Sequence, residues 1–189
     1  MNYYVEIHVA PDPEFPPAFL LNALFSKLHR ALAAGQRQDI GVSFPAFKEG
    51  RRTQTLGNIL RLHGARAALD TLMDSGWLRS MRDHVTVIPC QPIPSATRHR
   101  VVKRQQFKTS AERLRRRRAA RHGETMAQAR QHIPDSIERQ VTLPYLHISS
   151  LSTRQRFCLF VAHGPLLTEP ISGTFNAYGL SCTATIPWF

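Results

Sequence analysis

The sequence contains few of the residues on which several common classes of protein depend. Its three cysteines (Cys90, Cys158 and Cys182) are scattered and form no CxxC pair, which argues against a disulfide framework or a thiolate zinc site and suits a reducing cytoplasm. No run of 18 or more apolar residues is present, so we expect no membrane-spanning segment. The N-terminus also lacks the basic and apolar regions of a secretory signal.

Acidic residues are scarce as well, with 13 Asp and Glu against 25 Lys and Arg. They are too sparse for the carboxylate cluster of a two-metal nuclease. Asp12 and Glu14 form a close pair, but prolines surround them, and a turn explains them better than a metal site. Neither a Walker loop nor a GxGxxG motif is present. We therefore expect no metal and no cofactor.

The positive charge is concentrated in one part of the chain. Eleven of the 25 basic residues lie between Arg98 and Arg121, where Glu112 is the only acid. Charge runs are often solvated faces or disordered tails, but this one is interior and contains apolar residues. It lacks the apolar face of a membrane-surface helix. The patch therefore favours a polyanion as partner, and nucleic acid over a membrane.

The second part of this basic segment has the pattern of a helix. Ser110 can cap a helix over about 110–122, and Glu112 would lie in its first turn. Arg113, Arg117 and Arg121 then form a continuous ridge. Arginines around much of a helix suit the deep, phosphate-lined major groove of A-form RNA.

The first part, RHRVVKRQQFK at residues 98–108, alternates in polarity and is expected to be extended. Arg104 and Gln106 lie two residues apart, so their side chains can point the same way. Their planar groups can pair with guanine and adenine edges.

Apolar periodicity predicts an α+β chain whose first half has the order β-α-β-β-α-β, the ferredoxin-like pattern. The expected strands are 3–10, 40–44, 58–63 and 85–88, with helices at 18–34 and 65–74. We assign residues 1–91 to a ferredoxin-like domain, 92–97 to a linker and 98–189 to a smaller α+β domain with the arginine-rich helix. In that domain we expect a second helix near 125–133 and strands at 145–149, 157–162 and 173–178.

Among nine histidines, His29 is the one of chemical interest. It lies one helical turn after Phe25, at the edge of the apolar stripe of the first predicted helix. A lone histidine at such a position is usually a partly buried core residue, so the pattern alone does not make it catalytic.

Several motifs, taken together, resemble a known family. They are PDPEFPPAFLLNALFSKLHRAL, IGVSFP, RQQFK followed three residues later by ERLRRR, RQRFCLFVAHGPL, and the final YGLS and PWF. In order and spacing they resemble the CRISPR repeat-processing endoribonucleases of the type I-F system, from residue 3 to residue 189.

The resemblance implies both an architecture and an activity. Members join a ferredoxin-like domain to a smaller domain that bears an arginine-rich helix. They bind the hairpin of each CRISPR repeat transcript and cut at the base of its stem without metal. They then remain bound to the product, the crRNA, together with the other subunits of a surveillance complex.

The resemblance also implies roles for individual residues. The catalytic histidine falls on His29, the ribose-contacting serine on Ser150 (with Ser149 and Ser152 as neighbouring alternatives), and the active-site tyrosine on Tyr178. The residues that would bind RNA are Arg104, Gln106, Lys108, Arg113, Arg116, Arg117, Arg121 and Phe157. Among these, Arg104 and Gln106 would read bases, and Phe157 would stack on the last base pair of the stem.

One departure from the family pattern lies in the helix. Ala120 stands where an arginine is expected, and Arg118 stands where an apolar residue is usual. Residues two apart do not share a helix face, so Arg118 cannot simply replace the missing side chain.

The implied mechanism uses the RNA's own 2′-hydroxyl as nucleophile. His29 would be the general base, Ser150 would hold the ribose, and Tyr178 would orient or polarise the imidazole. The products would be a 2′,3′-cyclic phosphate and a 5′-hydroxyl. Two alternatives stay open: a non-catalytic guide-RNA-binding subunit of an effector or transposon-linked complex, and a general RNA-binding protein of ribosomal type.

Overall fold

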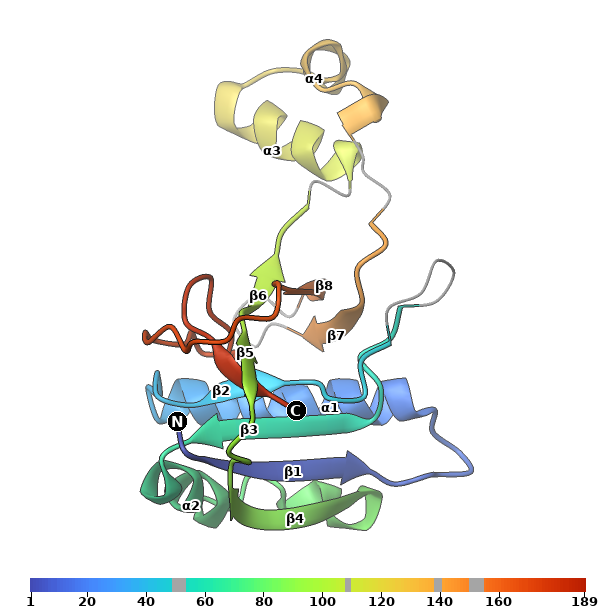
Figure 1. Cartoon of the computed structure of the whole chain (residues 1–189). Helices are drawn as coiled ribbons and strands as arrows, with labels where there is room; N and C mark the ends of the chain where they lie inside the picture. Colours follow the sequence, from blue (N-terminus) through green and yellow to red (C-terminus); the bar gives the residue numbers. More distant parts are fainter. Residues whose placement is uncertain (49–53, 108–109, 138–140, 150–154) are drawn as a thin grey trace. The chain divides into compact units, whose positions relative to one another are not determined.

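Two units make up the chain in the computed structural model, which describes residues 1–48, 54–107, 110–137, 141–149 and 155–189. The first unit comprises Met1–Gln105 and Pro144–Phe189, and the second comprises Gln106–Leu143. The helices α1–α4 and the strands β1–β8 can be followed by label in Figure 1. Each unit is described by itself below.

The first unit is built on a four-stranded antiparallel sheet in the order β2-β3-β1-β4 (Figure 1). Its strands are β1 (Tyr3–Val9), β2 (Gly41–Ser43), β3 (Ile59–Gly64) and β4 (Val85–Pro92). Helix α1 (Pro17–Ala34) connects β1 to β2, and α2 (Arg66–Asp74) with the 3₁₀ helix η1 (Arg79–His84) connects β3 to β4. This is the ferredoxin-like topology, so the predicted α+β class is confirmed.

Helix α1 forms because its sequence meets the local requirements of a helix. Pro17 occupies the first turn, where its missing N–H costs nothing, and the Gly35 N–H donates to the Ala31 carbonyl at the other end. One stripe is buried at 0–3% exposure: Leu20, Leu21, Leu24, Phe25, Leu28 and Leu32. This stripe packs in the same core as the sheet residues Val42, Leu60 and Leu62. This packing leaves His29, the residue after Leu28, at the edge of the core.

The extended part of the basic segment contributes strands to the first unit. β6 (Val102–Gln105), β8 (Arg156–His163) and β7 (Tyr145–Ser149) form a three-stranded antiparallel sheet in that order. β5 (Arg98–Arg100) pairs with β9 (Ile186–Trp188). The predicted extended conformation is thus confirmed in both strands, and β9, in the closing IPWF, was not predicted.

The strand predicted at 173–178 is wrong, because a turn occupies its end. The Asn176 side chain accepts hydrogen bonds from the backbone N–H groups of Tyr178 and Leu180, at 2.8 and 3.3 Å. Gly179 follows with a φ of 69°. Hydrogen bonds from a side chain to its own neighbouring backbone compete with the backbone hydrogen bonds between strands, and at this position the side-chain bonds form instead.

The second unit contains α3 (Ala111–His122), α4 (Met126–His132) and the short 3₁₀ helix η2 (Asp135–Ile137). The predicted cap is confirmed, because the Ser110 hydroxyl accepts from the Arg113 N–H at 3.2 Å. Gly123 ends α3 in the left-handed conformation. Thr125 and Gln128 form a reciprocal capping box at the start of α4. In the part of the chain described, no helix is long and apolar enough to cross a membrane.

A buried ion pair ties strands of the first unit together. Arg61 on β3 is 8% exposed, and its Nε donates to a Glu6 carboxylate oxygen on β1 at 2.7 Å. Another nitrogen of the same guanidinium donates to the backbone oxygen of Phe189 at 2.7 Å. The guanidinium carbon also lies 3.9 Å from the centre of the Phe189 ring.

Replacing Arg61 with methionine should therefore destabilise the first unit strongly. The substitution leaves the buried Glu6 carboxylate without the guanidinium and with His8 Nε2, 3.1 Å away, as its remaining partner, which costs on the order of 3 kcal/mol in the free energy of unfolding. Urea denaturation measures this loss. Arg66→Met is the matched control, because the Arg66 pair with Asp70 is exposed and long at 3.7 Å, and such pairs contribute at most about 1 kcal/mol. Equal unfolding midpoints for the two variants would contradict the assignment.

Candidate functional site

The imidazole of His29 makes one defining hydrogen bond. His29 is half-buried on α1, and its Nδ1 lies 2.8 Å from the backbone carbonyl oxygen of Ala177. A carbonyl can only accept, so Nδ1 carries a proton. When the ring is neutral, Nε2 therefore holds the free lone pair. This is the tautomer that a general base acting through Nε2 requires.

The Tyr178 ring fixes the plane of the same imidazole. The two ring centres are 4.0 Å apart and the planes differ by 15°, a stacked contact. The Tyr178 ring is also parallel to Phe25, with centres 6.3 Å apart. The contact with His29 is thus made by the face of the tyrosine ring, which restricts rotation of the imidazole.

Arg104 and Phe157 extend this cluster. The guanidinium carbon of Arg104 lies 5.3 Å from the centre of the Phe157 ring and 5.6 Å from that of Tyr178, within cation–π range of both. Its Nε is buried and has no hydrogen-bond partner among the residues that the structure describes. The structure therefore brings four predicted residues together in the first unit: His29, Tyr178, Arg104 and Phe157.

Two arginines of α3 hold the second unit together. Arg115 is 6% exposed, and it donates to the Ile133 carbonyl at 2.8 Å and pairs with Asp135 at 2.7 Å. Arg118 donates two hydrogen bonds to Glu124, both at 2.8 Å. These bonds from Arg118 hold the pKa of the Glu124 carboxyl below its ordinary value. Arg118, the departure from the family pattern, thus braces the connection between α3 and α4.

The other arginines of α3 lie on its surface. Arg113, Arg116, Arg117 and Arg121 are all exposed, and Arg116 lies 3.5 Å from Glu112 one turn before it. A cavity of about 290 Å³ is lined by Leu114, Arg117, Arg118, Arg121, His122 and Ile133. The four arginines of α3 predicted to bind RNA are therefore the ones that the packing of this unit leaves exposed.

Some predicted residues cannot be placed with the others. Ser150, its alternative Ser152 and Lys108 lie outside the described residues. Ser149 ends β7 and is exposed, and Gln106 is exposed at the start of the second unit.

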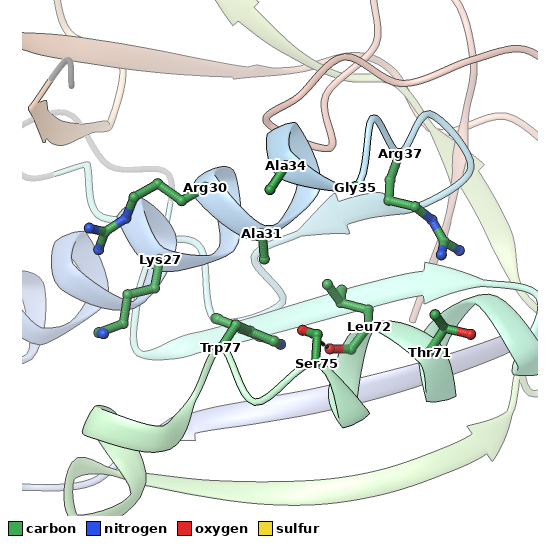
Figure 2. Close-up of a pocket in the computed structure, with 10 residues that line it drawn as sticks. All are labelled: Lys27, Arg30, Ala31, Ala34, Gly35, Arg37, Thr71, Leu72, Ser75 and Trp77. Carbon is green, nitrogen blue, oxygen red and sulfur yellow. Dashed lines mark hydrogen bonds between the residues drawn. The ribbon is translucent and has the colours of Figure 1, made fainter. Parts of the chain in front are cut away.

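A separate groove of about 490 Å³ lies between α1 and α2 (Figure 2). Figure 2 shows Lys27, Arg30 and Ala31 on α1 across from Leu72 and Trp77. None of the predicted site residues lines this groove.

The sequence interpretation missed Asn176 and the carbonyl of Ala177. The available signal was the NAYG stretch, in which Asn and Gly are typical turn residues. Over the described ranges, no three His, Cys, Asp or Glu residues are grouped so that they could hold a metal ion.

Comparison with known proteins covers nearly the whole chain. The family model described as CRISPR-associated protein (Cas_Csy4) matches residues 4–189. A protein named CRISPR-associated endonuclease Cas6/Csy4 from Escherichia coli (strain UTI89 / UPEC) is 45% identical over 189 residues, all of both chains. One of the same name from Pseudomonas aeruginosa (strain UCBPP-PA14) is 44% identical, again over the full length of both.

Because Arg115 is buried and Arg116 is exposed, replacing one or the other should affect the stability of α3 differently. Arg115→Leu should lower the free energy of local opening of α3 by about 1–3 kcal/mol, because the Ile133 carbonyl and Asp135 lose their charged donor. Hydrogen exchange of the α3 amides measures this change. The control Arg116→Leu, on the exposed side, should stay within about 0.5 kcal/mol of the parent. Equal protection in the two variants would show that Arg115 does not brace the unit.

Proposed function

The chain belongs to the Cas_Csy4 family of CRISPR-associated proteins, and on that premise we propose that it is a metal-independent endoribonuclease of CRISPR repeat transcripts. It binds the repeat hairpin and cleaves at the base of the stem. The observation that best supports this activity is the hydrogen bond from His29 Nδ1 to the Ala177 carbonyl. It leaves Nε2 as a proton acceptor on a ring that stacks on Tyr178, and the Arg104 guanidinium carbon lies 5.6 Å from the centre of the same tyrosine ring.

The proposed reaction needs only the RNA and these side chains. Nε2 of His29 accepts the proton of the 2′-hydroxyl, and that oxygen attacks the adjacent phosphorus. A bond from the 2′-oxygen to phosphorus forms while the bond to the 5′-oxygen breaks, and the departing oxygen takes a proton from solvent. The products are a 2′,3′-cyclic phosphate and a 5′-hydroxyl. Much of the rate comes from alignment, because Tyr178 restricts the imidazole and Ser150 holds the ribose.

Substrate recognition is proposed to use two kinds of contact. Phe157 stacks on the last base pair of the stem, and Arg104 and Gln106 read base edges. The proximity of Arg104 and Phe157 to Tyr178 supports this, because a stem end held there is close to His29. The exposed arginines of α3 and Lys108 bind phosphates of the stem.

After cleavage the protein keeps its product, in this proposal, and serves as the RNA-bound subunit of a type I-F surveillance complex. The many contacts between arginines and RNA phosphates favour slow release of the cleaved RNA. An enzyme that acts once on each transcript does not need a high turnover rate.

His29→Ala should separate binding from cleavage. The variant lacks the proposed base, so the single-turnover rate on a repeat hairpin should fall by about 10²–10⁴-fold, while hairpin affinity is retained. Gel-based cleavage and filter binding measure the two quantities. A hairpin with a 2′-deoxy nucleotide before the scissile phosphate should bind the parent protein and remain uncut. Cleavage that survives either change would refute the mechanism, and a parent protein that binds but never cuts would indicate a guide-RNA-binding subunit.

Arg117→Ala should weaken hairpin binding and reduce its dependence on salt. Losing one phosphate contact lowers the slope of log affinity against log salt concentration by about 1, because fewer counterions are released. Titrations at several salt concentrations measure the slope. Arg79→Ala, an exposed arginine of η1, is the control and should leave the slope unchanged. The same slope for both variants would remove Arg117 from the interface.

A further inference from the structure

The turn that follows Phe175 is organised by one side chain. Asn176 Oδ1 accepts from the Tyr178 N–H at 2.8 Å and from the Leu180 N–H at 3.3 Å. The Asn176 backbone N–H donates to the Leu180 carbonyl at 2.9 Å, and its carbonyl accepts from the Gly179 N–H at 2.8 Å. Asn176 thus closes the turn around Ala177 and Tyr178.

This turn supplies both contacts that define the imidazole of His29. The Ala177 carbonyl accepts from Nδ1 at 2.8 Å, and the Tyr178 ring stacks on the imidazole with centres 4.0 Å apart. Two adjacent residues of one turn therefore determine which nitrogen carries the proton and how the ring is oriented.

The turn is also anchored to the sheet at its far end. The Gly179 carbonyl accepts from the Val42 N–H on β2 at 2.8 Å. Gly179 has a φ of 69°, and a Cβ at this position would clash with the Val42 side chain. The anchor on β2 sets where the turn lies, and the Asn176 side chain sets its internal shape.

We propose that Asn176 is a positioning residue that selects the tautomer of His29. The proposal rests on the proposed function only in taking Nε2 as the catalytic base. Without the Asn176 side-chain oxygen, the N–H groups of Tyr178 and Leu180 lose their acceptor and the turn relaxes. The Ala177 carbonyl then no longer holds the proton on Nδ1, and a neutral ring protonated on Nε2 cannot accept the proton of a 2′-hydroxyl.

The tautomer can be read directly by long-range ¹H–¹⁵N spectra of the full chain with labelled histidine, at a pH where the imidazole is neutral. The parent protein should show His29 protonated on Nδ1. Asn176→Ala should shift the signal toward protonation on Nε2 and lower the single-turnover cleavage rate on the order of 10²-fold, with hairpin affinity unchanged. Asn176→Asp keeps the accepting oxygen and should restore the parental tautomer and most of the rate.

Asn58→Ala is the matched control, because among the described residues the Asn58 side-chain amide forms a single hydrogen bond, a long one of 3.5 Å to the Val9 carbonyl. It should leave the tautomer and the rate unchanged. If Asn176→Ala does not fold, Asn176→Ser replaces it, since a serine hydroxyl bonds the backbone two residues on more weakly and should give an intermediate shift. A parental tautomer in whichever of these two variants folds would overturn the proposal. Cleavage by His29→Ala would refute the proposed function while leaving the tautomer measurement valid.

Discussion

The hydrogen bond between the His29 ring and the Ala177 carbonyl is the interaction on which the functional interpretation depends. It joins residues 148 positions apart in the chain, so it exists only when α1 and the turn near the C-terminus are both in place. The buried stripe of α1 holds one side, and the bond from Val42 to Gly179 holds the other. A general base needs a defined lone pair, and a neutral backbone carbonyl defines it here.

The arginines show how neighbours decide what a residue type does. Arg115 and Arg118 have a carbonyl or a carboxylate within 2.8 Å, and they stabilise the second unit. Arg113, Arg116, Arg117 and Arg121 project from the exposed side of the same helix. Counting charge along the chain treats all six alike. The packing of α3 against α4 separates the arginines that stabilise the unit from those that lie on its exposed surface.

Much of the fold was predictable because it follows from local periodicity. The apolar stripe of α1 and the alternation in β1 led to correct elements, and their order led to the correct sheet topology. The strand expected at 173–178 was wrong because the side chain of Asn176 bonds the backbone of its own turn. Strand β9 was missed because its pairing partner, β5, is far away in sequence. The spacing of apolar residues predicts neither the side-chain bonding of Asn176 nor the pairing of β9 with β5.

The sequence by itself determined the family, the βαββαβ order, the concentration of positive charge and the candidate residues His29, Tyr178, Arg104 and Phe157. The element order and the charge follow from residue type and spacing, whereas the family and the choice of Tyr178 and Phe157 follow from the resemblance of the motifs to that family. Only the tertiary structure decided that the four side chains meet, that Nδ1 of His29 is the protonated nitrogen, and that Arg115 and Arg118 are internal braces. Each of these outcomes depends on which backbone carbonyl or carboxylate lies within hydrogen-bond distance, and folding alone sets those distances.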